Sequence, residues 1–196
     1  MATALPLEST RSVRSAVVEQ ELIDDVARAI AAVSDRHDPG LDSWWEASAD
    51  PKAFERSGAP SHFTASALPI TADGTRVCLV LHGRMGLWVQ PGGHLEAGDR
   101  SVREAAQREL AEETGLVGSI SAEPLCLSRH PAPCGQADWH LDLQMLAVVP
   151  QVVPVLSEES TDVAWFEARR LPSGIASGVD ALVGRAVDRV SRIGSR

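Results

Sequence analysis

Three glutamates in the middle of the chain, Glu109, Glu112 and Glu113, have the side chains and the spacing of a metal site. On a helix that turns about 100° per residue, Glu112 lies about 60° to one side of Glu109 and Glu113 about 40° to the other. The apolar residues at positions 102–106 share this sector, so the acids continue a face expected to be buried. Clustered carboxylates resist burial unless a cation compensates them. The pattern therefore predicts a site for Mg²⁺ or Mn²⁺, which prefer oxygen ligands.

A solvated acidic face at a helix end is the alternative interpretation of this triplet. Two features favour the metal site. The acids lie on the apolar stripe, and Gly92 and Gly93 just upstream would let bare backbone approach a ligand. Arg108, about 100° from Glu109, is expected to pair with a carboxylate and fix its position, which places it among the catalytic residues.

The helix that carries these acids is predicted over residues 101–114. Ser101 and Glu104 have the spacing of a capping box at its start. Gly115 favours the left-handed conformation that ends a helix. Both ends of the acidic helix are therefore encoded locally.

Strands and a closing helix surround this segment. Apolar runs predict the strands, and Asp73-Gly74 predicts a hairpin turn between the first two. The spacing from Ile175 to Val190 predicts a closing amphipathic helix. The predicted strands cover residues 63–70, 77–81, 87–89, 125–128, 141–149 and 163–166. A mixed sheet covered by helices fits this order of elements.

The first part of the chain, residues 1–58, is predicted to be a helical extension, and residues 59–196 to be the main domain. Apolar residues at spacings of three and four predict an amphipathic helix over 17–33. Asp50-Pro51 then predicts the start of a short helix, with the aspartate as its N-cap.

The charge balance excludes some classes of partner. The chain has 196 residues, with 18 basic against 27 acidic side chains and a net charge of −9. A long nucleic acid or an anionic membrane needs a basic face, so neither is expected as a partner. The three cysteines form no C-x-x-C pair, and no segment has the apolar length of a signal peptide or a membrane span. The expected location is cytoplasmic.

The stretch from Gly92 to Leu116 resembles the signature box of the Nudix hydrolase superfamily. The family pattern is a glycine, five residues, a glutamate, seven residues and then R-E-U-x-E-E-x-G-U, where U is aliphatic. The second half matches from Arg108 through Leu116. In the first half Gly93 plus five residues leads to Asp99 in place of glutamate, and eight residues then separate Asp99 from Arg108. This insertion falls in the loop before the helix, which leaves the helix geometry intact.

The resemblance implies an α+β fold, a Nudix-type α/β/α sandwich with a mixed β-sheet, to which the N-terminal helical extension is added. It also implies a hydrolase that cleaves a diphosphate linkage in a nucleoside diphosphate derivative or related small molecule by attack of metal-activated water. In the family, Mg²⁺ or Mn²⁺ is held by the residues that correspond to Gly92, Glu109, Glu112 and Glu113. Glu112 is our first choice of general base, and Glu159 is the alternative.

A second metal site is suggested by His62, His94, His140 and Asp142. Their positions resemble those of metal-binding residues in isopentenyl-diphosphate isomerase, a Nudix relative, which has histidines at the first two and glutamates at the others. Such a set suits Zn²⁺, Mn²⁺ or Fe²⁺. The alternative is that each histidine is a polar residue at the edge of a cleft. The isomerase reaction is disfavoured, because Gly92 stands where that enzyme has a cysteine and the chain has no tyrosine.

A non-catalytic Nudix domain that senses a nucleotide or metabolite is the alternative function. Such domains usually lose box carboxylates, and the three here are retained. Loops and extensions outside the box determine specificity. Trp44, Trp45 and Trp139 are therefore candidates for stacking on a base, against the alternative of packing or a dimer contact. The resemblance alone suggests a homodimer.

Overall fold

The computed structural model describes residues 8–33, 39–56, 59–132, 134 and 137–194. The α-helices are α1 (Glu8–Val33), α2 (Asp42–Ser48), α3 (Val102–Thr114) and α4 (Val179–Gly194), and the 3₁₀ helices are η1 (Pro39–Leu41) and η2 (Pro51–Phe54). The strands are β1 (Ser61–Ile70), β2 (Arg76–His82), β3 (Trp88–Val89), β4 (Gly92–His94), β5 (Ser119–Ile120), β6 (Cys126–Pro131), β7 (Trp139–Val148) and β8 (Ser160–Glu167). Among the described residues, no helix is long and apolar enough to cross a membrane.

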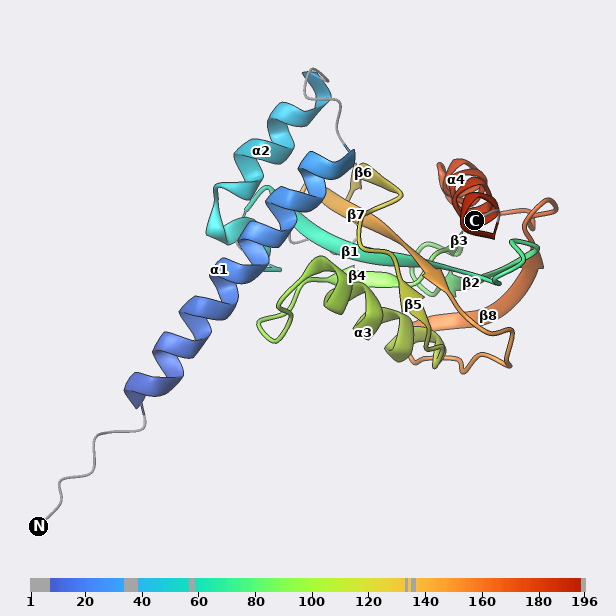
Figure 1. Ribbon diagram of the computed structural model, residues 1–196, viewed down its shortest axis with the longest axis horizontal. Coiled ribbons are helices and arrows are strands. Elements are labelled where there is room, and N and C mark those ends of the chain that lie inside the picture. The colour runs from blue at the N-terminus through green and yellow to red at the C-terminus, as the bar shows by residue number, and fades with distance from the viewer. Residues whose placement is uncertain (1–7, 34–38, 57–58, 133, 135–136, 195–196) are drawn as a thin grey trace, which may run out of the picture.

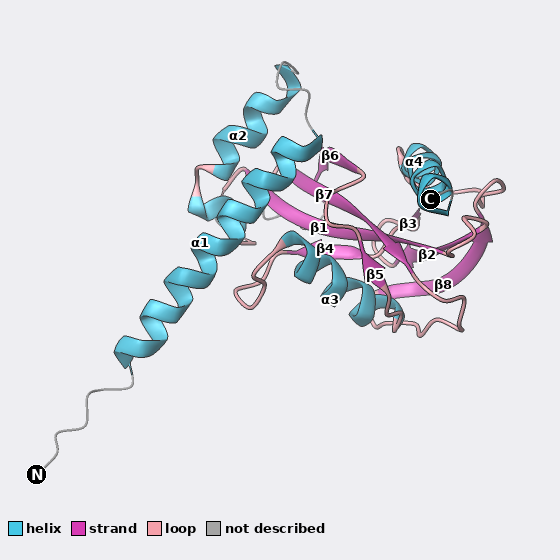
Figure 2. Cartoon of the chain, in the orientation of Figure 1, coloured by secondary structure: helices cyan, strands magenta, loops and turns pink. Residues whose placement is uncertain are grey.

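The strands form one mixed sheet with helices on both sides (Figures 1 and 2). The parallel pair β1 and β7 lies at its centre, and the other strand pairs are antiparallel. Helices α3 and α4 pack on opposite faces of this pair. The architecture is the mixed sheet between helices that the sequence predicts.

Alternation along β1 assigns its side chains to the two faces. Phe63, Ala65 and Ala67 lie in the core cluster that contains α3, whereas Leu68 and Ile70 lie in the cluster that contains α4. Successive side chains of a strand point to opposite faces, which explains this division. The even-numbered residues at the start of β1 are polar and face the same side as α4.

Helix α3 has the ends that its sequence predicts. The side chain of Ser101 accepts a hydrogen bond from the backbone N–H of Glu104, and Gly115 ends the helix at φ 66°. The apolar residues of its inner face are buried: Val102, Ala105, Ala106 and Leu110. The helix is therefore fixed by local caps and by an apolar stripe that packs on the sheet.

The segment Gly92–His94, which was not among the predicted strands, forms the short strand β4. It pairs antiparallel with β1, and Gly92 lies opposite Ser66. A Cβ atom on Gly92 would lie 2.4 Å from the Cβ of Ser66. Glycine therefore permits two strands to approach closely here. A Gly-Gly pair in a sequence can indicate either such an approach or a turn.

Helix α1 also differs from its prediction, because it begins at Glu8 and not near position 17. Its buried residues Leu22, Val26 and Ile30 join the same core cluster as Phe63 and Leu110. The apolar periodicity predicts the buried residues Leu22, Val26 and Ile30, but it does not predict where the helix begins. The extension thus packs on the domain, while the division at residues 58 and 59 stays a prediction.

We expect Ile30→Ala to lower the free energy of unfolding by about 2–5 kcal/mol, because a fully buried isoleucine leaves a cavity when truncated. Ile193→Ala is the matched control: Ile193 is 59% exposed, and its truncation should change stability by no more than about 0.5 kcal/mol. Urea unfolding of both variants measures this. Equal effects would show that α1 does not contribute to the core.

Candidate active site

The three glutamates of α3 differ in their exposure. The side chains of Glu109 and Glu112 are 12% and 59% exposed, and Glu113 is buried. Two carboxylates therefore face the protein, and the third lies at the solvent boundary. This arrangement follows from the helical spacing, which places Glu109 and Glu113 nearest the apolar stripe.

The backbone of β4 lies against these buried carboxylates. A Cβ atom on Gly93 would lie 2.5 Å from Oε1 of Glu109, so only glycine fits here without displacement. The backbone N–H of Gly92 donates a hydrogen bond to the carboxylate of Glu113. The two glycines thus bring main-chain atoms to the acidic face of α3.

The surroundings of the two inner carboxylates oppose their ionisation. Burial raises the pKa of Glu109 to about 7, although hydrogen bonding to Arg108 acts in the other direction. Burial and the charge of Glu109 raise the pKa of Glu113 to about 8. Glu159, in the turn before β8, adds to the rise at both groups. The charge of the alternative general base therefore acts on both inner glutamates of α3.

Arg108 connects this acidic face to the preceding loop. Its guanidinium contacts the carboxylates of Asp99 at 2.9 Å, Glu109 at 2.7 Å and Glu112 at 3.1 Å. It also donates to the backbone carbonyl of His94 at 2.9 Å. Asp99, which is 5% exposed, thus orients the arginine, and this gives the position that departs from the family pattern a structural role.

The chemistry of this donor set fits a divalent cation. Oε2 of Glu113 is buried and has no hydrogen-bond partner among the described residues. A buried oxygen of this kind is costly unless a ligand satisfies it. Carboxylates of Glu109, Glu112 and Glu113, together with the backbone of Gly92, would hold such an ion.

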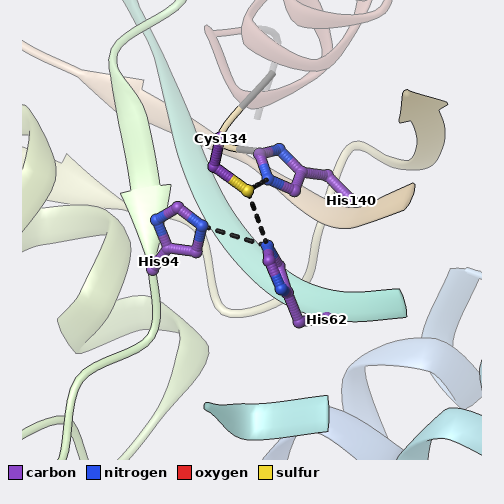
Figure 3. Close-up of side chains that lie close together, drawn as sticks. All are labelled: His62, His94, Cys134 and His140. Carbon is purple, nitrogen blue, oxygen red and sulfur yellow. Dashed lines mark hydrogen bonds between the residues drawn. The ribbon is translucent and has the colours of Figure 1, made fainter. Parts of the chain in front are cut away.

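A second group of side chains gathers on the other side of β4 (Figure 3). It contains His62 from β1, His94 from β4, His140 from β7 and Cys134 from the segment between β6 and β7. One ligand atom from each lies within 4.8 Å of all the others. The structure thus brings together three of the four residues that the sequence suggests for a second metal site.

Asp142 is the residue that does not join this group. Its carboxylate accepts hydrogen bonds from Thr64, Ser66, Gln90 and Gln144. It lies on the same face of β7 as His140, as alternation predicts, but four neutral donors surround it. The structure therefore does not bring Asp142 together with the three histidines, and its role as a metal ligand stays a prediction.

Sequence reasoning missed Cys134. It lies six positions before His140, and its Sγ is 3.5 Å from Nε2 of that histidine. The available signal was a cysteine a few residues before a histidine, in a chain whose cysteines form no C-x-x-C pair.

The histidines of this group are held in their neutral form. Burial lowers the pKa of His94 to about 4 and that of His140 to about 3, and the charge of His62 lowers both further. Burial and the charge of Arg56 lower the pKa of His62. Neutral imidazoles keep a nitrogen lone pair for a ligand or a hydrogen bond.

The tryptophans suggested for base stacking occupy three different environments. Trp44 is buried, with its ring centroid 6.1 Å from that of Phe63, so it belongs to the core and is not available for stacking. Trp45 is 39% exposed. The guanidinium of Arg129 lies 4.2 Å from the ring of Trp139.

The family model described as NUDIX domain matches residues 60–182. The chain belongs to the NUDIX family. This confirms the resemblance seen in the box and, with the sheet between α3 and α4, the Nudix-type α+β fold. The match covers the sheet, the acidic helix and the start of α4.

The chain is also similar to individual proteins of known sequence or structure. Phosphatase NudJ from Escherichia coli (strain K12) is 63% identical over 38 residues, which are 19% of this chain and only 22% of NudJ. The NUDIX domain of Shewanella oneidensis NrtR, in a complex with ADP ribose, is 26% identical, with a TM-score of 0.55 over 76% of this chain and 98% of that one. A NUDIX family hydrolase from Clostridium perfringens is 21% identical, with a TM-score of 0.55 over 67% and 97%.

We expect the stability of the metal-free protein to fall as the pH rises from 7 to 8. The folded pKa values of Glu109 and Glu113, about 7 and about 8, lie above the ordinary value of 4.5. The folded state therefore binds more protons than the unfolded state, and its relative stability is lost as these groups ionise. The lowered histidine pKa values act oppositely, but this effect weakens above the ordinary value of 6.5 and is small by pH 8.

Urea unfolding in the presence of a chelator, at several pH values above 6.5, measures this slope. Glu113→Gln removes one of the ionising groups and should flatten it, and added Mg²⁺ or Mn²⁺ should oppose it. A stability that rises over this interval in the chelated wild type would contradict the burial of both carboxyl groups.

We expect Gly93→Ala to weaken Mn²⁺ binding by more than about tenfold, because an added methyl group would displace the Glu109 carboxylate from its position. Calorimetric titration with Mn²⁺ measures the affinity. Gly98→Ala is the matched control, since a Cβ atom there meets no atom within 4 Å. Similar affinities for the two variants would show that β4 does not position the glutamate.

Proposed function

We propose that this chain is a divalent-metal-dependent hydrolase that cleaves a diphosphate linkage in a nucleoside diphosphate derivative or a related small molecule. One observation carries the proposal. On the helix that bears the NUDIX box, the buried Oε2 of Glu113 has no hydrogen-bond partner among the described residues, and Glu109 lies beside it. Such a pair needs a cation, and a diphosphate is the kind of group that a cation so placed would bind.

Mg²⁺ or Mn²⁺ is the proposed cofactor, held by Glu109, Glu112, Glu113 and the backbone of Gly92. When bound, the ion would neutralise the diphosphate and lower the pKa of a water molecule. A chain with a net charge of −9 otherwise repels such a substrate. Phosphatase NudJ and the ADP-ribose complex of the NrtR domain support phosphate-containing small molecules as the substrate class.

The other residues of the site have separate roles. Arg108 holds Glu109 and Glu112 through its guanidinium and is fixed by Asp99. Glu112 is the exposed member of the triplet, so its carboxylate is open to an incoming water molecule. We assign it as the general base, which takes the proton of the attacking water. Glu159 is the second candidate, because its charge reaches the same carboxylates.

The cytoplasmic location and the homodimer stay predictions. The three cysteines are free, as a reducing compartment would leave them. Trp45 and Trp139 stay candidates for contact with the substrate. An isomerase-like reaction gains no support, because Gly92 occupies the cysteine position and pairs with β1.

We expect Glu112→Gln to lower the turnover number by about 10²–10⁴-fold, the usual contribution of a general base. The assay is hydrolysis of a panel of nucleoside diphosphate derivatives with Mg²⁺ and with Mn²⁺. Glu159→Gln, measured in parallel, should have the smaller effect. Glu123→Gln is the control, since Glu123 is exposed and lies outside the site.

The outcomes separate the alternatives. Metal-dependent turnover that survives Glu112→Gln but not Glu159→Gln would transfer the role of base to Glu159. Binding of a panel compound without turnover in the wild type would favour a non-catalytic sensor domain and would overturn the proposed hydrolase.

A further inference from the structure

The histidine and cysteine group is separated from the glutamates of α3 by the strand β4. Gly93 lies opposite Ala65, on the face that packs against α3, and its Cβ position meets Glu109. His94 follows it and lies opposite Thr64. Since neighbouring residues of a strand face opposite sides, the imidazole of His94 points away from α3. The two groups are therefore distinct sites that share one strand.

The four ligand atoms have the spacing of a tetrahedral zinc site. Zinc binds nitrogen at about 2.0–2.1 Å and sulfur at about 2.3 Å, so tetrahedral angles require nitrogen–nitrogen distances of about 3.4 Å and sulfur–nitrogen distances of about 3.6 Å. Nε2 of His62 lies 3.0 Å from Nε2 of His94. Sγ of Cys134 lies 3.7 Å from Nε2 of His62 and 3.5 Å from Nε2 of His140. These three distances are close to the tetrahedral values, and all four ligand atoms lie within 4.8 Å of one another, so movement of the side chains would allow one ion to bind all four.

The direction of the side chains supports the same conclusion. The four side chains converge on one point from three strands and a connecting segment (Figure 3). His62 and His140 are adjacent across the parallel pair β1 and β7, which fixes their separation by sheet register. Polar groups that merely pack would turn toward backbone or solvent partners. Here the nitrogen and sulfur atoms face one another.

We propose that His62, His94, Cys134 and His140 bind one Zn²⁺ ion. Nitrogen and thiolate ligands select zinc over Mg²⁺, which prefers oxygen. Four protein ligands complete a tetrahedral shell and leave no open position for substrate, so the ion has a structural role. Asp142, with its four hydrogen-bond donors, stays outside this shell.

The zinc ion would fix β4 with respect to the centre of the sheet. His94 is the last residue of β4, directly after the two glycines that approach the glutamates. Its backbone carbonyl accepts a hydrogen bond from Arg108. An ion that joins the imidazole of His94 to ligands on β1 and β7 would therefore also fix the main chain of β4 beside the carboxylates of α3. Cys134 adds the segment between β6 and β7 to the same anchor.

The first test uses the unaltered full chain, produced in zinc-supplemented medium and passed over a desalting column. Elemental analysis should give about one zinc per chain, and zinc X-ray absorption should show one sulfur at about 2.3 Å with three nitrogens at about 2.0–2.1 Å. Cobalt substitution should give the thiolate charge-transfer band of a tetrahedral Co²⁺ site. These readouts depend on no variant and on no activity.

Variants then assign the ligands. Cys134→Ser and His140→Ala should each weaken zinc binding by more than about tenfold, since even the loss of an outer-shell partner costs that much. Cys134→Ser should also remove the cobalt charge-transfer band. Cys126→Ser and His130→Asn are the controls, because they are a cysteine and a histidine of β6 that lie outside the group. Both should retain the zinc and the spectrum.

The results distinguish this site from the proposed hydrolase. Wild-type protein without zinc, or zinc bound by oxygen ligands alone, would overturn the zinc site whatever the turnover. Zinc content unchanged by Cys134→Ser would do the same. Glu112→Gln should keep its zinc, so a chain that retains zinc but hydrolyses nothing would overturn only the hydrolase.

Discussion

The burial of negative charge beneath α3 is the constraint on which the arrangement around it depends. Arg108 contacts Glu96, Asp99, Glu109 and Glu112, so one guanidinium is shared among four carboxylates. Glu96 and Glu112 are exposed, whereas Asp99 and Glu109 are largely buried, where uncompensated charge is most costly. The cost is visible as the raised pKa of Glu109. Such an arrangement is costly unless a cation completes it, which is consistent with the metal site proposed above.

The short strand β4 places the two candidate metal sites back to back. Gly92 and Gly93 lack the side chains that would separate the strand from Ser66 on one side and from Glu109 on the other. Because neither glycine has a Cβ atom, the main chain of β4 can lie close both to β1 and to the carboxylate of Glu109. The side chain of His94, the next residue, lies on the face of the sheet opposite to α3. Three residues thus position both sets of ligands, and a shift of this strand would disturb both.

The fold was predictable where local patterns determine it. The N-cap at Ser101, the helix end at Gly115 and the strand over residues 63–70 are each encoded over a few residues, and the structure has all three. Cys134 and Trp44 were not predictable in the same way. Whether a loop cysteine reaches three histidines, or a tryptophan enters the core, depends on how distant elements pack. Local spacing carries no information on that packing.

Buried carboxylates in this protein are stabilised in two different ways, and the difference shows where a hard cation belongs. Asp142 lies in the interior with hydrogen-bond donors such as Thr64 and Ser66 around it, so it needs no ion. Glu113 lacks such donors at one oxygen. Oxygen ligands on the α3 side of β4 and nitrogen with sulfur on the other side would keep a hard cation and zinc apart by ligand preference alone. The strand β4 would therefore lie between two proposed sites that do not compete for the same ion.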